Sequence, residues 1–187
     1  VEINSCYIFH PLNAYDAPDG TVVLDAARHE KMFDVEQRGP NEGFPTLDRW
    51  VLNPMTGKAS EKRLDDRPQE FPRINESLIG MQHNFGYLAG ISDVFRQADL
   101  IKQDLANQST QVRHDGENFG YGEPVFIARK GAKSEDDGYV MALRNNTETD
   151  LSDLVVLDAQ DFCGEPVATV HLPARVPNGF HGNWIAD

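Results

Sequence analysis

The chain has 187 residues, with 17 lysines and arginines against 30 aspartates and glutamates, and its net charge is −13. A surface this acidic repels phosphate backbones, which excludes nucleic acid as an expected partner. It also opposes electrostatic binding to anionic lipid, although an apolar patch leaves room for peripheral membrane contact. No apolar run is long enough to span a bilayer, and 40% hydrophobic residues are typical of one globular domain.

The start of the chain and its cysteines bear on its origin. Cys6 and Cys163 are too few for a disulfide framework, so we expect reduced thiols, which favours a cytoplasmic location. The chain begins at Val1 with neither an initiator Met nor a signal peptide, in what reads as the middle of a strand. We therefore expect a piece of a longer protein.

Short apolar or alternating runs bounded by Gly, Pro, Asn and Asp predict β-strands along the whole chain. In order, these runs are Thr21–Leu24, Arg49–Leu52, Asp99–Lys102, Pro124–Ala128, Tyr139–Leu143, Leu154–Leu157 and Val167–Leu172. The polar intervals Arg28–Thr46 and Glu76–Gln82 predict loops, and only Ala26–Phe33 has a pattern compatible with a short helix. The expected fold is therefore all-β.

An internal repeat adds to this prediction. Three segments of the form strand, polar turn, strand align on Asn53, Asp104 and Asp158. They recur about every 50 residues, a spacing typical of four-stranded propeller blades. An Asx side chain suits each turn because it can hydrogen-bond its own backbone. The spacing predicts about three and a half blades, which is too few for a closed propeller.

Two of the six histidines stand out by context. His10 ends an apolar run and precedes a proline. His181 is flanked by glycines, Gly179 two residues before it and Gly182 directly after it. Metal ligation requires neutral imidazoles held by an acceptor on the second ring nitrogen. By residue chemistry alone, a packed or surface position remains the commoner outcome for both. The other four, for which no ligand role is expected, are His29, His83, His114 and His171.

Two glutamates each begin an otherwise apolar stretch. Glu70 opens Glu-Phe-Pro-Arg-Ile-Asn and Glu123 opens Glu-Pro-Val-Phe-Ile. An unpaired carboxylate there is costly to bury. One interpretation is that each carboxylate lies at the solvent-exposed edge of its apolar stretch or forms a salt bridge, with Arg73 as the nearby partner for Glu70. The other is a buried acceptor for the N–H of a metal-ligating imidazole.

Other chemistries find no support in the sequence. The acidic run Glu135–Gly138 lacks the ligand spacing of an EF-hand and is interpreted as a tight hairpin turn. Neither a phosphate-binding glycine loop nor a nucleophile elbow is present, and neither cysteine has the context of a catalytic nucleophile.

Several motifs together resemble the carotenoid oxygenase family in its own order. They are Phe9-His-Pro-Leu-Asn-Ala-Tyr, Glu70-Phe-Pro-Arg-Ile-Asn, Gly122-Glu-Pro-Val-Phe-Ile-Ala-Arg, Glu135-Asp-Asp-Gly-Tyr-Val, Leu154-Val-Val-Leu-Asp-Ala and Leu172-Pro-Ala-Arg-Val-Pro-Asn-Gly-Phe-His-Gly-Asn-Trp. The resemblance covers nearly all of this chain and about the last two-fifths of a typical family member.

The resemblance implies a seven-bladed β-propeller with a non-haem Fe(II) on its axis, held by four histidines. Residues 1–187 would be the C-terminal part of that single domain, with about three to four blades present. His10 and His181 match the third and fourth metal ligands, and Glu70 and Glu123 match two of three glutamates that accept a hydrogen bond from a ligand. We expect Glu70 to orient His10 and Glu123 to orient His181. The remaining ligands would lie upstream.

The implied activity is cleavage of a carbon–carbon double bond of a carotenoid, apocarotenoid or stilbene, such as a lignostilbene, by O₂. The partners would be the apolar alkene and O₂, and the products two carbonyl compounds. One alternative is a non-catalytic propeller scaffold, because fold alone does not establish function. Another is a retinoid-type isomerohydrolase of the same family. The isolated chain is expected to be inactive, and the sequence leaves its oligomeric state open.

Overall fold

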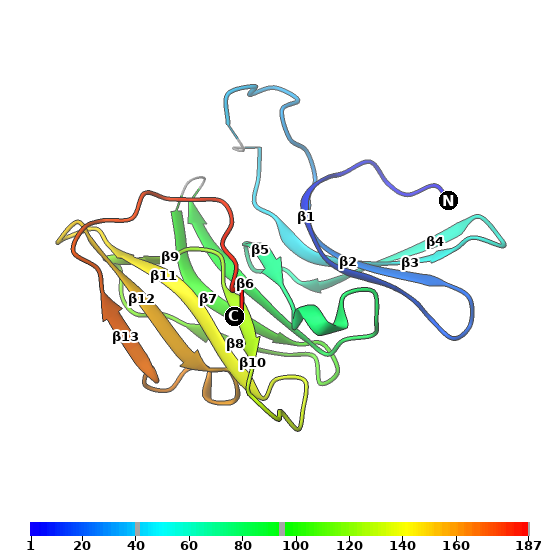
Figure 1. Cartoon of the computed structure of the whole chain (residues 1–187). Helices are drawn as coiled ribbons and strands as arrows, with labels where there is room; N and C mark the ends of the chain where they lie inside the picture. Colours follow the sequence, from blue (N-terminus) through cyan, green and yellow to red (C-terminus); the bar gives the residue numbers. More distant parts are fainter. Residues whose placement is uncertain (40–41, 94–95, 187) are drawn as a thin grey trace.

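The computed structural model describes residues 1–39, 42–93 and 96–186, and these residues form three antiparallel β-sheets (Figure 1). The described part of the chain contains no α-helix, only the 3₁₀ turns η1 (Glu76–Leu78) and η2 (Ala159–Asp161). The all-β prediction is therefore confirmed. None of the described helical turns is long or apolar enough to cross a membrane.

Each sheet is a meander in which consecutive strands pair. The first contains β1 (Tyr7–Asp16), β2 (Val22–His29), β3 (Thr46–Asn53) and β4 (Lys58–Asp65), and the second contains β5 (Gln69–Arg73), β6 (Phe85–Asp93), β7 (Arg96–Asp104) and β8 (Ser109–Arg113). The third contains β10 (Val125–Ala128), β11 (Gly138–Asn146), β12 (Leu151–Asp158) and β13 (Ala168–His171), with β9 (Phe119–Tyr121) also paired to β11. Every predicted strand overlaps one of these.

The predicted repeat corresponds to one sheet per repeat. Asn53, Asp104 and Asp158 each end the third strand of the meander in their own sheet. Each side chain also accepts a backbone N–H from the turn that follows, at 2.9 to 3.0 Å, from Met55 and Thr56, from Asn107, and from Gln160 respectively. The Asx side chains therefore form the turns for which their residue type is suited.

Two hydrophobic cores lie between the sheets. Leu12, Leu47, Ile74, Leu88 and Ile101 join the first sheet to the second. A larger cluster, which includes Tyr87, Tyr121, Phe126, Val140 and Phe162, joins the second sheet to the third. A single four-stranded sheet cannot bury both of its faces, so each sheet is stabilised by its neighbours.

The structure corrects two expectations from the sequence. The short helix over Ala26–Phe33 is wrong, because Ala26 and its neighbours continue β2 and pair with β1 on one side and β3 on the other. Ala26 and Ala27 are fully buried there, so their packing outweighs the helical preference of alanine. The strand expected at Val1 is also wrong, because β1 begins at Tyr7. Within the predicted loop Arg28–Thr46, residues 40–41 lie outside the described residues.

A buried ionisable group fixes the loop after η1 to the first sheet. The His83 side chain has no exposed surface and its Nε2 lies 3.5 Å from Asp25 Oδ2. Arg49 holds Asp25 through contacts of 2.6 and 2.7 Å, and Asn13 Nδ2 lies 3.2 Å from His83 Nδ1. Burial lowers the pKa of His83, although the charge of Asp25 opposes the shift.

This lowered pKa predicts a loss of stability in acid. Below about pH 6.5 the unfolded chain takes up a proton at His83 and the folded protein does not, so the free energy of unfolding falls as the pH is lowered towards the folded pKa. This one group contributes at most about 1.4 kcal/mol per pH unit. Urea unfolding of the wild type and His83→Gln at several pH values measures the effect. An identical pH dependence in the two proteins would contradict it.

Candidate metal centre

Three of the four predicted site residues occupy equivalent places in the three sheets. His10 lies in β1 and Glu70 in β5, and Glu123 lies just before β10. β1, β5 and β10 are each the first strand of a meander and stand at its edge. Equivalent edges of neighbouring sheets therefore supply residues to one region, and Figure 1 shows the end of the described chain returning to it.

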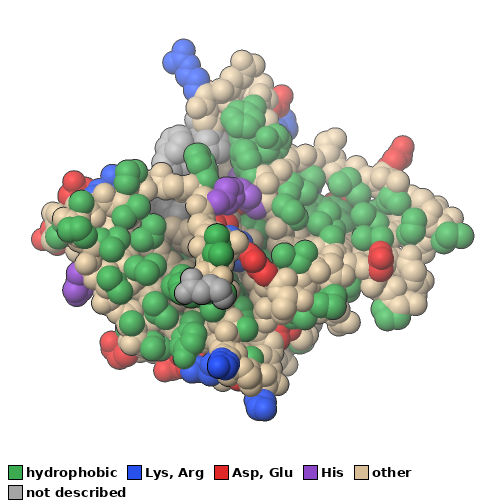
Figure 2. All heavy atoms as spheres, in the orientation of Figure 1, with side chains coloured by type: hydrophobic (Ala, Val, Ile, Leu, Met, Phe, Trp, Pro, Cys, Tyr) green, Lys and Arg blue, Asp and Glu red, His purple; other side chains and the backbone are tan. Residues whose placement is uncertain are grey.

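His181 reaches this region from the irregular segment after β13 (residues 172–186). Its ring centroid lies 4.9 Å from that of His10, and the two ring planes meet at 77°. Figure 2 shows histidine side chains gathered near the middle of this face, with acidic side chains close by. The structure thus brings together the two histidines that the sequence analysis singled out.

Glu70 holds the first imidazole. Its Oε2 lies 2.7 Å from His10 Nδ1, and the same carboxylate accepts the backbone N–H of Phe71. Phe71 has φ of 53° in the left-handed region, at a break in the β5–β6 register, so the chain turns the Glu70 carboxylate back onto the next backbone N–H. The Phe71 ring also packs against both imidazoles, 5.0 Å from His10 and 6.0 Å from His181.

The protonation of this pair follows from its contacts. Burial would raise the pKa of Glu70, but hydrogen bonds from His10 and His29 outweigh it and leave this pKa lowered. The hydrogen bond to Glu70 raises the pKa of His10 against the opposing effect of burial. An ionised Glu70 can only accept hydrogen bonds, so the Nδ1 proton of His10 faces it and the lone pair of the neutral ring lies on Nε2.

Glu123 holds the second imidazole in the same way. Its Oε1 lies 3.2 Å from His181 Nδ1, and its Oε2 accepts the backbone N–H of Gly182 at 2.9 Å. Arg73 Nη1 lies 3.0 Å from the same Oε2, so the suggestion that Arg73 forms a salt bridge with Glu70 is wrong. The Glu123 side chain is only 5% exposed, whereas the His181 side chain is 57% exposed. The expected pairing of each glutamate with its histidine is the one present.

The donor atoms of both rings suit a metal ion. Nδ1 of His10 and of His181 faces a carboxylate, and among the described residues neither Nε2 has a hydrogen-bond partner. A neutral imidazole with a carboxylate at its other nitrogen is the usual form of a metal-ligating histidine. The described chain brings no group of three or more His, Cys, Asp or Glu side chains together for a metal ion. The pair by itself supplies two imidazole Nε2 atoms.

His29 is a residue of this region that the sequence analysis missed. Its Nε2 lies 3.2 Å from Glu70 Oε1, and its buried Nδ1 has no partner in the described structure. The Phe9 ring packs edge-on against it with centroids 5.2 Å apart. The signal that could have found His29 is its place at the end of β2, opposite Tyr7 of the strand that carries His10.

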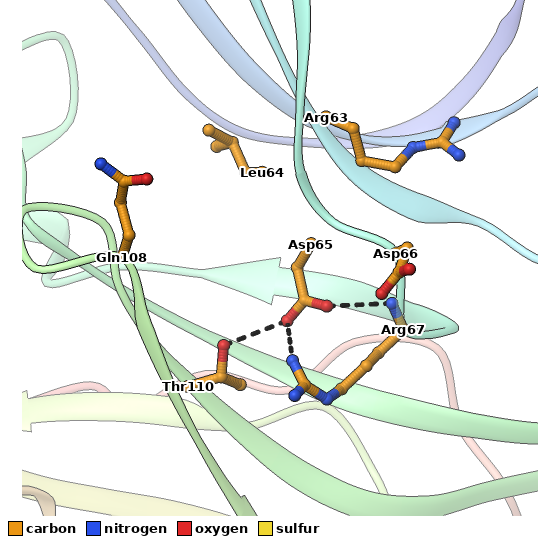
Figure 3. Close-up of a pocket in the computed structure, with 7 residues that line it drawn as sticks. All are labelled: Arg63, Leu64, Asp65, Asp66, Arg67, Gln108 and Thr110. Carbon is orange, nitrogen blue, oxygen red and sulfur yellow. Dashed lines mark hydrogen bonds and ion pairs between the residues drawn. The ribbon is translucent and has the colours of Figure 1, made fainter.

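A separate pocket of about 440 Å³ does not overlap this site. Figure 3 shows its lining residues, Arg63, Leu64, Asp65, Asp66, Arg67, Gln108 and Thr110. The Asp65 carboxylate already accepts hydrogen bonds from Arg67 Nη1 at 2.7 Å and Thr110 Oγ1 at 3.1 Å. The lining is polar and includes no histidine, so the paired imidazoles remain the candidate centre.

Comparisons with known proteins show the family of this chain. The family described as retinal pigment epithelial membrane protein matches residues 1–186. A carotenoid cleavage oxygenase of Mycobacterium tuberculosis is 44% identical over 98% of this chain and 38% of its own length. A carotenoid 9,10(9′,10′)-cleavage dioxygenase of Arabidopsis thaliana is 31% identical over all of this chain and 38% of its own.

A solved structure is similar in fold over nearly the whole chain. The cobalt-substituted apocarotenoid oxygenase of Synechocystis superposes with a TM-score of 0.91 at 25% identity, over 99% of this chain and 40% of its own. The chain thus spans about two-fifths of the length of the relatives that it matches. It belongs to the retinal pigment epithelial membrane protein family, the family of the carotenoid cleavage oxygenases.

Proposed function

We propose that this chain is the C-terminal part of a longer non-haem iron dioxygenase that cleaves a carbon–carbon double bond with O₂. The substrate class is a carotenoid, apocarotenoid or stilbene, and the products are two carbonyl compounds. The observation that carries the proposal is the adjacent pair of imidazoles, His10 and His181, each with a buried carboxylate at Nδ1. The names of the relatives, a carotenoid cleavage oxygenase and a carotenoid cleavage dioxygenase, support the reaction class.

The proposed fold of the whole enzyme is a seven-bladed propeller. In this proposal residues 1–187 form the C-terminal part of one domain, and each of the three described sheets is a blade. The matching Asx turns and the cores between neighbouring sheets support it. Two further ligands would come from residues outside this chain, so the isolated chain is not expected to turn over substrate.

In the proposed centre, His10 and His181 would hold Fe(II) through Nε2, the ring nitrogen that faces away from the carboxylate. Bound Fe(II) would supply the redox chemistry towards O₂ that protein side chains lack. Glu70 and Glu123 accept the Nδ1 protons, which fixes the tautomer and the orientation of each ring. The carboxylates would thus orient the two imidazoles without binding the metal themselves.

Aromatic side chains beside the imidazoles would help to exclude water and position an apolar alkene. Phe71 packs against both rings, and Tyr7, Phe9 and Phe33 form a partly exposed aromatic cluster next to His29. Contact with such rings requires no polar group on the substrate. Their role is to hold the double bond in place, and exclusion of water prevents side reactions.

Product analysis of the full-length protein tests the proposal. Carotenoid, apocarotenoid and stilbene substrates would be incubated with isotopically labelled O₂, and the products identified by mass spectrometry. Two labelled carbonyl fragments are expected from one of these classes. Products that keep the full carbon count would indicate an isomerohydrolase. An iron-free protein that transforms none of these substrates would indicate a scaffold.

The contact of His29 with Glu70 gives a further prediction. Replacing His29 with leucine in the full-length protein should weaken Fe(II) binding by up to about tenfold, because Glu70 loses one of its two imidazole donors. His29→Gln, whose side-chain amide can still donate to Glu70, should retain most of the affinity. Anaerobic Fe(II) titration measures both. Equal losses of Fe(II) affinity in the two variants would contradict the prediction, because they would show that the hydrogen bond donated to Glu70 does not determine the affinity.

A further inference from the structure

Arg73 lies between the Glu123 carboxylate and the segment that carries His181. Its Nη1 is 3.0 Å from Glu123 Oε2 and donates to the carbonyl of Gly182 at 2.9 Å. Its Nη2 donates to Asn183 Oδ1 at 3.2 Å and to Glu76. The Arg73 side chain is only 17% exposed. One guanidinium thus contacts a buried carboxylate and two successive residues that follow His181.

Residues 179–186, the last part of the segment after β13, make few other hydrogen bonds or ion pairs with the rest of the described chain. The earlier part of the segment is bound to the third sheet, through Leu172 and Val176 to Ser152 and through Asn178 to Asn145. Within the described structure, the hydrogen bonds and ion pairs that join residues 179–186 to the rest of the chain go to Glu123 and Arg73.

Burial contributes little to holding this part of the segment. The Phe180, Trp184 and Ile185 side chains are all exposed. An irregular segment with exposed apolar side chains depends on its polar contacts for a fixed position. Apart from the ring contacts of His181 with His10 and Phe71, the position of this segment therefore depends on Glu123 and Arg73.

We propose that Arg73 is a positioning residue for the metal centre: it anchors the segment that carries His181 and directs the free oxygen of Glu123 to that imidazole. Arg73 and the Gly182 N–H occupy Oε2, which leaves Oε1 for His181 Nδ1. The planar fork of a guanidinium can bind a carboxylate, a carbonyl and an amide oxygen at once, which a lysine ammonium cannot reproduce in the same geometry. The inference rests on the proposed function.

Arg73 contacts only one of the two pairs of glutamate and histidine, the pair of Glu123 and His181. In the described part of the chain Glu70 has ion-pair contacts with His10 and His29 and none with a lysine or arginine. Glu123, in contrast, shares its charge between His181 and Arg73. Loss of Arg73 should therefore disturb the ligation by His181 and leave the pair of His10 and Glu70 intact.

Co(II) binding to the metal-free full-length protein tests this inference, with the visible absorption of Co(II) as a readout independent of turnover. Arg73→Met should weaken Co(II) binding about tenfold to a hundredfold and shift the absorption bands, and Arg73→Lys should show the same effects to a smaller degree. Arg129→Met, which removes a guanidinium bound to Asp137 and Asp158 in the third sheet, is the matched control and should bind like the wild type.

A double-mutant comparison separates positioning from general stability. In a His181→Ala background, Arg73→Met should cause little further loss of Co(II) affinity, because the ligand that it positions is already absent. Wild-type affinity and spectrum in Arg73→Met would overturn the inference, as would an equal loss in both backgrounds. If Arg73→Met does not fold, Arg73→Lys carries the same comparison. A wild-type protein that binds no Co(II) would instead overturn the proposed function, and with it this inference.

Discussion

Replacing His10 or His181 with alanine in the full-length protein is expected to remove most of the bound iron and to abolish measurable cleavage. Each substitution deletes one of the two imidazoles whose centroids lie 4.9 Å apart. Removal of a group that only supports a ligand typically costs about tenfold to a hundredfold in metal affinity, so the loss of a ligand itself should exceed that range. Atomic absorption and product formation measure the two effects.

A matched control for these variants is His171→Ala. His171 lies on β13, is 83% exposed, and contacts Asp153 at 2.7 Å, so it has a carboxylate partner without a place in the site. It should retain iron and activity. Full iron content and full activity in both the His10 and the His181 variants would refute the assignment of these residues as ligands.

Substitution of Glu70 is expected to give the second largest effect. This carboxylate accepts from His10 Nδ1, His29 Nε2 and the Phe71 N–H, and it is almost completely buried. In Glu70→Gln one oxygen becomes an NH₂ group that faces an imidazole donor, so even this isosteric change leaves one buried donor unpaired. Fe(II) affinity should fall about tenfold to a hundredfold in Glu70→Gln.

Anaerobic metal titration of the full-length protein measures this loss. The control is Glu148→Gln, which changes a glutamate that accepts from Asn118 Nδ2 at an exposed turn of the third sheet. It should bind iron like the wild type. Unchanged affinity in Glu70→Gln would mean that the charge and both oxygens of Glu70 are unnecessary for holding the imidazole.

Local patterns in the sequence predicted the features that depend on local chemistry. The strands followed from alternating runs, and the repeat followed from Asn53, Asp104 and Asp158, whose side chains bond to their own turns. The helix predicted over Ala26–Phe33 failed because β2 is a central strand with a partner on each side. Tertiary pairing there outweighs the intrinsic preference of its alanines.

The candidate site was only partly predictable for a similar reason. The motifs pointed to His10, His181, Glu70 and Glu123, but residues that act between motifs depend on register and on the path of irregular chain. Arg73 is only three residues from Glu70, yet it forms its ion pair with Glu123, 50 residues further along the chain. The backbone between Glu70 and Arg73 has a positive φ at Phe71 and a shift in strand register. A local pattern carries no such information.

The most direct test of the account is anomalous diffraction at the iron absorption edge from crystals of the full-length protein. A single anomalous peak is expected within coordinating distance of Nε2 of both His10 and His181, with Nδ1 of each ring still in contact with Glu70 or Glu123. Iron bound at another site in crystals of active protein would contradict the proposed metal centre. So would an iron position that Nε2 of His10 or of His181 does not face.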